Sequence, residues 1–119
     1  LYKTSSGREV LTEFIDSLDE ITRARIRNSI RVLAEHGLEL LRNKSIKKIA
    51  RNPDIFELRT VGERQVRIFF TVHHSGVYVL LHIIIKKSQK TLSKEIKLAQ
   101  KRAKELVDLL LTENVLSDI

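Results

Sequence analysis

The 119-residue sequence contains no cysteine, no methionine and no tryptophan, and it has one proline and four glycines. Without cysteine it can form no disulfide framework, thiolate metal site or cysteine nucleophile, which suits a reducing cytosol. The longest apolar run, residues 77–85, includes a tyrosine and a histidine and falls far short of the ~20 residues that span a bilayer. No charged-then-apolar leader opens the sequence. We therefore expect a cytoplasmic protein with no membrane partner.

A chain of this length has room for one domain, and no repeat, low-complexity tract or Pro/Gly/Ser-rich linker divides it. With 42% apolar and 31% charged residues, the composition is that of a globular protein rather than a disordered one. We predict a single domain over residues 1–119, in which residues 112–119 form a frayed tail.

The formal net charge of +7 lies in one stretch of the chain. Residues 84–104 contain eight basic residues and one acidic residue, whereas the basic and acidic residues of the remaining chain are equal in number. A charge concentrated in this way favours a polyanionic partner, of which nucleic acid is the commonest. The alternative is a solvated helix face, which is what most charge runs form.

Apolar residues at helical spacing predict two helices in the first third of the chain. Ser6 and Glu9 have the spacing of a capping box before the first helix. Asp19 can cap the second helix, and Gly37 is placed to end it. Two helices with so short a connection form an antiparallel hairpin with one apolar side. The segment 38–54 fits no single pattern and closes on a turn at Asn52-Pro53-Asp54.

From Ile55 onward the apolar pattern has a period of two, which predicts three strands joined by hairpins. The third strand, from Val77 to about Lys87, is apolar on both sides, as a central strand is. One parity of this strand is unbroken (Val77, Val79, Leu81, Ile83 and Ile85) and is expected to face the helical hairpin. The opposite, open face of the sheet then carries Arg59, Arg67, Phe69, His82 and Lys86.

A last helix follows, for which Thr91 is the candidate cap and whose outer side carries the basic run. The predicted fold is therefore α+β, with an N-terminal helical hairpin packed on a small antiparallel sheet and a basic C-terminal helix.

The sequence contains none of the common nucleotide-binding or metalloprotease motifs. Glu57 and Glu63 are the only acidic residues between Ile55 and Lys94, which disfavours a two-metal nuclease because such a site needs several carboxylates. His73 and His74 are adjacent, so on a strand they point to opposite faces. We predict no metal and no cofactor.

A cationic face can cleave RNA without a metal, because the 2′-OH of RNA is an internal nucleophile. Arg59 and Arg67 offer planar guanidinium groups that suit phosphate oxygens, and Phe69 can stack on a base. Lysines stabilise the transition-state charge and can transfer protons when their pKa is lowered; the candidates are Lys86, Lys87 and Lys90. His82 is either an acid–base group or a satisfied, partly buried histidine. The arginines can instead pair with Glu57 and Glu63, and Phe69 can instead pack under the last helix.

Several segments together resemble a known protein family. They are Phe56-Glu57-Leu58-Arg59, Val66-Arg67-Ile68-Phe69-Phe70, Val79-Leu80-Leu81-His82 and Lys86-Lys87-Ser88-Gln89-Lys90-Thr91, preceded by Thr4-Ser5-Ser6-Gly7-Arg8 and Glu13-Phe14-Ile15-Asp16-Ser17-Leu18. In this order they resemble the phage-derived HigB-like toxins of the RelE/ParE toxin–antitoxin superfamily, over about residues 2–104.

The resemblance implies a RelE-like fold with a small twisted sheet, and a toxin that cleaves mRNA on the ribosome. It also implies a cognate antitoxin, of the HigA-like helix-turn-helix kind. The family's strand arginine falls on Arg67, its basic residues at the end of the last strand fall on Lys86 and Lys87, and His82 is the counterpart of the histidines on which other members rely. With the residue-level reasoning above, we predict Arg67, Lys86, Lys87 and His82 as catalytic residues and Arg59, Phe69, Gln89, Lys90 and Lys94 as RNA-binding residues.

The sequence departs from some relatives, because it has no tyrosine after Tyr78 to act from the final helix. The alternatives are a non-catalytic ParE-like inhibitor of DNA gyrase, a plain RNA-binding module, and an inactive descendant that binds only its antitoxin.

Overall fold

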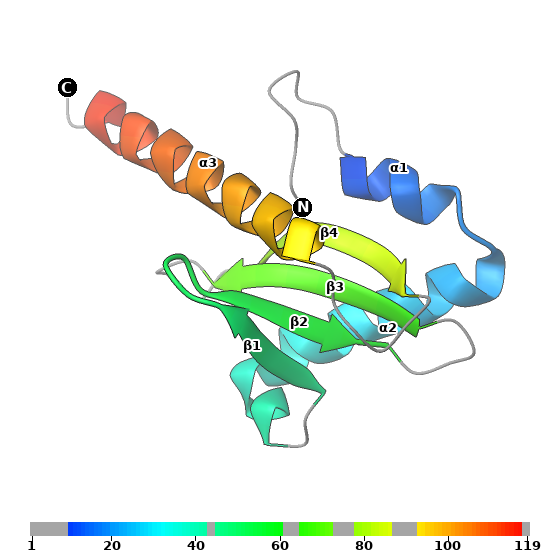
Figure 1. The fold of residues 1–119 in the computed structure, drawn as a ribbon. Helices are drawn as coiled ribbons and strands as arrows, with labels where there is room; N and C mark the ends of the chain where they lie inside the picture. The colour runs from blue at the N-terminus through cyan, green and yellow to red at the C-terminus, as the bar shows by residue number, and fades with distance from the viewer. Residues whose placement is uncertain (1–9, 43–44, 61–64, 73–77, 87–92, 118–119) are drawn as a thin grey trace.

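The computed structural model describes residues 10–42, 45–60, 65–72, 78–86 and 93–117, and confirms the α+β architecture (Figure 1). In chain order the elements are α1 (Val10–Asp16), α2 (Glu20–His36), the 3-10 helix η1 (Gly37–Leu41), β1 (Ile46–Ala50), β2 (Ile55–Arg59), β3 (Gln65–Val72), β4 (Tyr78–Lys86) and α3 (Ser93–Ser117). The four strands form one antiparallel sheet in the order β1-β2-β3-β4. No helix of the described ranges is long and apolar enough to cross a membrane.

The second helix of the helical hairpin begins and ends as its sequence predicts. The side chain of Asp19 accepts a hydrogen bond of 3.0 Å from the backbone N–H of Thr22, which caps α2. At the other end, Gly37 has φ 56° and donates its backbone N–H to the carbonyl of Leu33. Glycine adopts this left-handed conformation without strain. Ser6 and Glu9, the predicted cap of the first helix, lie outside the described residues.

Strand β1 was not expected, because its sequence does not alternate. The pairing of β1 with β2 shifts register between Lys48 and Ala50. Ile46 packs in the core beneath the helical hairpin, and Ile49 and Ala50 pack beside the core on the opposite face. Ile46 and Ile49 are three positions apart and so point to opposite faces, both of which are covered, and the apolar residues of this short strand therefore show no period of two.

The predicted faces of β4 are wrong for part of the strand, because β4 contains a second bulge. Phe69 pairs with His82 and Phe70 pairs with Leu80, so Leu81 is an extra residue in β4. Ile83 and Ile85 face the helical hairpin as expected, but Val79 and Leu81 contact the opposite core cluster. The unbroken apolar parity therefore does not lie on one face, because a one-residue insertion exchanges the faces of all residues on one side of it.

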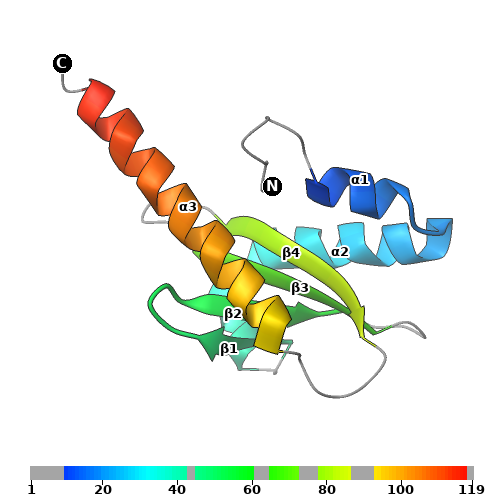
Figure 2. The same cartoon turned by 45° about the horizontal axis from the view of Figure 1, so that its top comes forward.

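The molecule has three layers, with α1 and α2 on one face of the sheet and α3 on the other (Figures 1 and 2). The smaller core cluster lies under α3 and consists of Ile55, Phe69, Leu81, Ala99 and Ala103. Ala99 and Ala103 are 0% and 1% exposed, and their small side chains let α3 approach the strands closely. Figure 1 shows α3 crossing the end of the sheet at which β1 turns into β2 and then projecting beyond it.

The predicted frayed tail begins at residue 112, within the last turns of α3. The backbone of α3 continues as a helix to Ser117. The sequence offers no glycine or proline in this stretch to end the helix. The first turns of α3 are thus held by the sheet, and the later turns extend past it (Figure 2).

Candidate functional site

Three basic side chains surround one buried carboxylate on the α3 side of the sheet, at the end that α3 does not cross. Glu57 is 0% exposed, and its Oε1 atom lies 3.5 Å from Nε of Arg67, 3.8 Å from Nε of Arg59 and 3.9 Å from Nζ of Lys47. These four residues are called the cationic cluster below. The alternative that the arginines pair with Glu57 is confirmed; Glu63, the other partner considered, lies outside the described residues.

Strand register explains why these four residues meet. Lys47 is directly opposite Glu57, and Arg59 is directly opposite Arg67. Because Glu57 and Arg59 are two positions apart on β2, they share a face. Phe69, opposite Glu57, packs under α3 and identifies this face as the α3 side. The sequence thus predicted correctly that Arg59, Arg67, Phe69 and His82 share one side of the sheet.

The electrostatics of the cationic cluster are not those of a merely structural ion pair. Two guanidinium groups directly opposite each other on adjacent strands repel, and one carboxylate leaves the four side chains with two positive charges in excess. Burial lowers the pKa of Arg67 from its ordinary value, Glu57 acts in the opposite direction, and Arg59 adds to the lowering. The strands therefore hold a buried guanidinium and two exposed cations around one carboxylate, an arrangement that suits an anionic ligand.

Exposure differs sharply within the cationic cluster. The side chains of Lys47 and Arg59 are 50% and 46% exposed, whereas that of Arg67 is 6% exposed. This corrects the expectation that Arg67 lies on an open face. Lys47 and Arg59 form the accessible surface of the cationic cluster, and Arg67 forms its floor beside Glu57.

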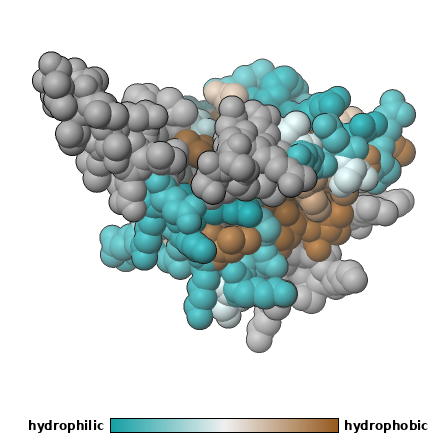
Figure 3. Space-filling view, turned by 90° about the horizontal axis from the view of Figure 1, so that it is seen from above, coloured by the Kyte–Doolittle hydropathy of each residue, from teal (hydrophilic) through white to brown (hydrophobic). Residues whose placement is uncertain are grey.

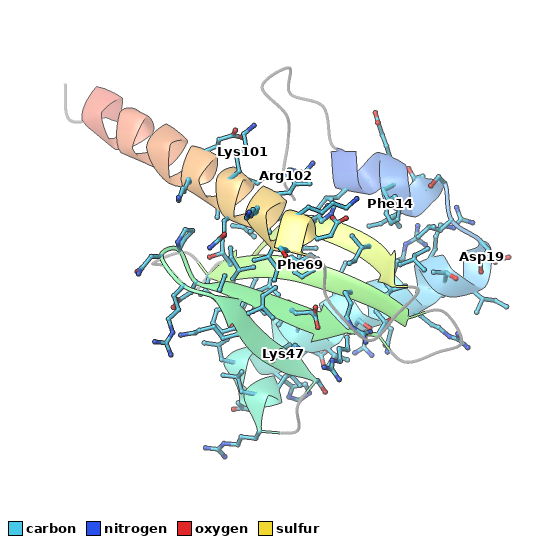
Figure 4. The ribbon with its side chains drawn as sticks, viewed as in Figure 1. Phe14, Asp19, Lys47, Phe69, Lys101 and Arg102 are labelled. Carbon is cyan, nitrogen blue, oxygen red and sulfur yellow. The ribbon has the colours of Figure 1, made fainter. Side chains whose placement is uncertain are left out.

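Phe69 does not lie on an open face either. Its ring is 0% exposed and packs with Leu81, Ala99 and Ala103 beneath the first turns of α3 (Figure 4). The alternative that Phe69 packs under the last helix is confirmed. Its ring presents no surface to a base, because the helix covers the face that the sequence pattern left open.

His82 connects β4 to α3. Its ring stacks on Phe69, with 5.9 Å between ring centroids. Nε2 bonds the carboxylate of Glu95, and Nδ1 lies 3.3 Å from Nη1 of Arg102, which also donates a 2.7 Å hydrogen bond to the carbonyl of Leu81. Only a neutral ring that donates from Nε2 and accepts at Nδ1 satisfies both neighbours.

The surroundings of His82 favour this neutral ring. Burial, the largest effect, lowers the pKa of His82, although the hydrogen bond and charge of Glu95 act in the opposite direction; the charge of Arg102 adds to the lowering. The side chain is 16% exposed. These contacts match the expectation of a satisfied, partly buried histidine.

The end of β4 brings one further basic position near the cationic cluster. Lys86 is the last residue of β4 and lies opposite Gln65, two residues beyond Ile84, which is opposite Arg67. Its backbone position is therefore diagonal to Arg67 on the neighbouring strand. The side chain of Lys86, and all of Lys87, Gln89 and Lys90, lie outside the described part of the structure.

The solvent side of α3 carries much of the positive charge. Lys94, a predicted RNA-binding residue, is exposed on the first turn, and the same helix exposes Lys97, Lys101 and Lys104. Seen from above, most of the coloured surface is hydrophilic, with apolar residues near its middle (Figure 3). Among the described residues, no group of three His, Cys, Asp or Glu side chains is placed to hold a metal ion.

Sequence reasoning missed Lys47 and the central position of Glu57. Lys47 was missed because β1 carries an isoleucine and a lysine on each face and so shows no apolar alternation, and Glu57 was considered only as a partner of the arginines. The available signal was the pair Lys47-Lys48 between Ile46 and Ile49, which fits a strand with one lysine on each face.

Comparison with known proteins places the chain in a family. No curated protein matches it significantly. Residues 13–104, more than half of the chain, match the family described as phage derived protein Gp49-like (DUF891). The matched range extends from α1 through the sheet to the first turns of α3 and thus includes every residue of the cationic cluster. The chain belongs to the phage-derived Gp49-like (DUF891) family, which is part of the RelE/HigB-like toxin group.

Proposed function

We propose that this protein is the toxin of a type II toxin–antitoxin system and that it cleaves messenger RNA on the ribosome. Family membership supports a toxin of the RelE/HigB-like group. The observation that carries the RNA substrate is the cationic cluster, in which three basic side chains meet on the side of the sheet that also bears α3, a helix with exposed lysines. Positive charge of this extent binds a phosphate backbone.

The proposed reaction needs no metal, because the attacking group belongs to the substrate. The 2′-oxygen forms a bond to phosphorus and loses its proton, and the bond from phosphorus to the 5′-oxygen breaks as that oxygen gains a proton. The products are a 2′,3′-cyclic phosphate and a 5′-hydroxyl. Negative charge increases on the phosphate oxygens during the attack, and cations fixed beside them stabilise it.

Each basic residue has a role in this proposal. Arg59 is exposed and contacts the scissile phosphate, while Arg67 contributes positive charge from the floor of the cationic cluster. Lys86 and Lys87 are the proton-transfer and phosphate-binding candidates, and Gln89, Lys90 and Lys94 position the strand. We assign His82 no proton transfer, because Glu95 and Arg102 contact both of its ring nitrogens. We assign Phe69 no base contact, because its ring is fully buried.

The experiment induces the chain in bacterial cells and maps the ends of transcripts. The proposal predicts cuts within translated messages for the unmodified chain and far fewer for Arg59→Ala. The matched control is Arg51→Ala, which removes an exposed arginine in the turn between β1 and β2 and is expected to cut normally. Growth arrest with intact messages and a DNA-damage response would support the gyrase-inhibitor alternative instead.

The proposal includes a cognate antitoxin, a partner that toxins of this group have. We expect a small neighbouring reading frame that encodes a helix-turn-helix protein of the HigA-like kind. Co-expression of that protein should restore growth to cells that express the toxin. Continued growth arrest in its presence would contradict this partner.

A further inference from the structure

Two adjacent lysines of β1 have different surroundings. Nζ of Lys47 is 3.9 Å from the Glu57 carboxylate on the α3 side of the sheet. Nζ of Lys48 is 3.2 Å from Asp54 and 5.7 Å from the centroid of the Phe56 ring, which faces the helical hairpin. The two side chains are similarly exposed, at 50% and 41%. They differ in the face that they occupy far more than in charge or exposure.

We propose that Lys47 and Arg59 together bind one phosphate group of the RNA strand, and that Glu57 is the positioning residue that holds them beside Arg67. The proposal rests on the proposed function, since it names the group that the cationic cluster binds. Figure 4 shows Lys47 on β1 in front of the sheet. Neither Lys47 nor Glu57 belongs to the residues that the sequence pattern selected.

The geometry supports a phosphate between these two side chains. Both cations lie within 4 Å of one carboxylate oxygen, so their charged ends point toward a common centre. About half of each side chain remains exposed, and a guanidinium and an ammonium group each carry more N–H donors than one contact with a carboxylate oxygen uses. A phosphate accepts from a guanidinium and an ammonium group at once, and the cations need no rearrangement when they are already gathered.

The carboxylate of Glu57 is required to keep the three basic side chains close together. Without its charge, Lys47, Arg59 and Arg67 repel one another, and the two long exposed side chains move apart into solvent. The carboxylate itself is 0% exposed and therefore does not contact RNA. It acts through the cations that it orients.

The first experiment compares Lys47→Ala with Lys48→Ala, because both variants remove one positive charge from the same strand. Binding is measured by fluorescence anisotropy with a single-stranded RNA that is 2′-O-methylated throughout and so cannot be cleaved. Lys47→Ala should weaken binding several-fold. It should also make the fall of log affinity with log salt less steep by about 0.7, the value for one phosphate contact on a single strand. Lys48→Ala should leave both quantities close to those of the unmodified chain.

The second experiment distinguishes the positioning role of Glu57 from its contribution to the net charge. The two explanations predict opposite changes in RNA affinity when Glu57 is neutralised. Glu57→Gln makes the protein more positive, so a diffuse electrostatic field predicts tighter RNA binding. Positioning by Glu57 predicts weaker binding, together with partial recovery in Glu57→Asp, which keeps the charge. Thermal unfolding of each variant shows whether the fold persists. If Glu57→Gln does not fold, the two lysine variants decide the proposal, since both side chains are exposed.

Equal effects of Lys47→Ala and Lys48→Ala would overturn the proposal, as would tighter binding by a folded Glu57→Gln protein. Failure of the unmodified chain to bind the RNA would also overturn the phosphate site. Cuts mapped in cellular messages would still support the proposed function in that case. Conversely, a phosphate site confirmed in a chain that leaves messages intact would support the RNA-binding alternative.

Discussion

At the scale of single residues, the contacts of His82 distinguish two roles that its sequence position left open. The ring lies between a fully buried phenylalanine and the first turns of α3, and both of its nitrogens have partners. A histidine in this setting stabilises the junction of β4 with α3 while it is neutral. The charges that face it are Glu95 and Arg102.

This neutral histidine predicts a dependence of stability on pH. The pKa of His82 is lowered in the folded protein relative to its ordinary value of 6.5. Its stabilising contribution is therefore complete above about pH 6.5 and is lost as the pH falls through the folded pKa. Urea unfolding between about pH 5 and pH 8 should show a steeper loss at low pH for the unmodified chain than for His82→Gln. Identical pH profiles would contradict this assignment.

The burial of Phe69 predicts a large effect on stability. Removal of a fully buried phenylalanine side chain lowers the free energy of unfolding by about 3–5 kcal/mol, so Phe69→Ala should unfold at a much lower urea concentration. Phe69→Leu keeps most of the apolar volume and should be less destabilised. Leu38→Ala, at a 40% exposed position, is the control and should change stability little. A Phe69→Ala protein of unchanged stability would show that the ring is not part of the core beneath α3.

At the scale of elements, the prediction succeeded where the sequence pattern is regular and failed at single inserted residues. The alternation in β2 and β3 gave the correct faces for Arg59 and Arg67. In β1 and β4 a bulge shifts the parity, and no local residue signal announces where the extra residue lies. The burial of Phe69 under the last helix was one of two alternatives that the sequence left open, and the burial of Arg67 was not foreseen, because alternation gives the face of a side chain and not what covers that face.

A side chain at position 37, where α2 ends, is expected to be both strained and too close to Tyr78. Gly37 has φ 56°, and a Cβ atom built there would clash with the hydroxyl of Tyr78 and lie 3.3 Å from its Cζ atom. The backbone strain alone costs about 1–3 kcal/mol, so Gly37→Ala should lower the free energy of unfolding by at least that amount. The double variant Gly37→Ala/Tyr78→Phe should recover only the part caused by the hydroxyl contact. Full recovery, measured by urea unfolding, would show that the backbone conformation of Gly37 is not strained for alanine.

At the scale of the whole molecule, the α3 side of the sheet is the candidate binding surface, because both concentrations of positive charge lie there. The helical hairpin packs on one face of the sheet, and the α3 side carries both the cationic cluster and the exposed lysines of α3. The sequence revealed that the net charge of +7 resides in residues 84–104. The structure adds a second concentration on β1, β2 and β3, where the strands bring together basic residues that are far apart in the chain.

The measurement that tests cleavage by the 2′-OH most directly is the chemistry of the fragment ends. Purified protein is incubated with ribosomes on a defined message, and the fragments are examined for their terminal groups. Attack by the 2′-OH predicts 5′-hydroxyl ends and 2′,3′-cyclic phosphate ends, and no cut at a nucleotide that carries 2′-deoxyribose. Fragments with 5′-phosphate ends, or an undiminished cut at the deoxy position, would contradict metal-independent cleavage by this protein.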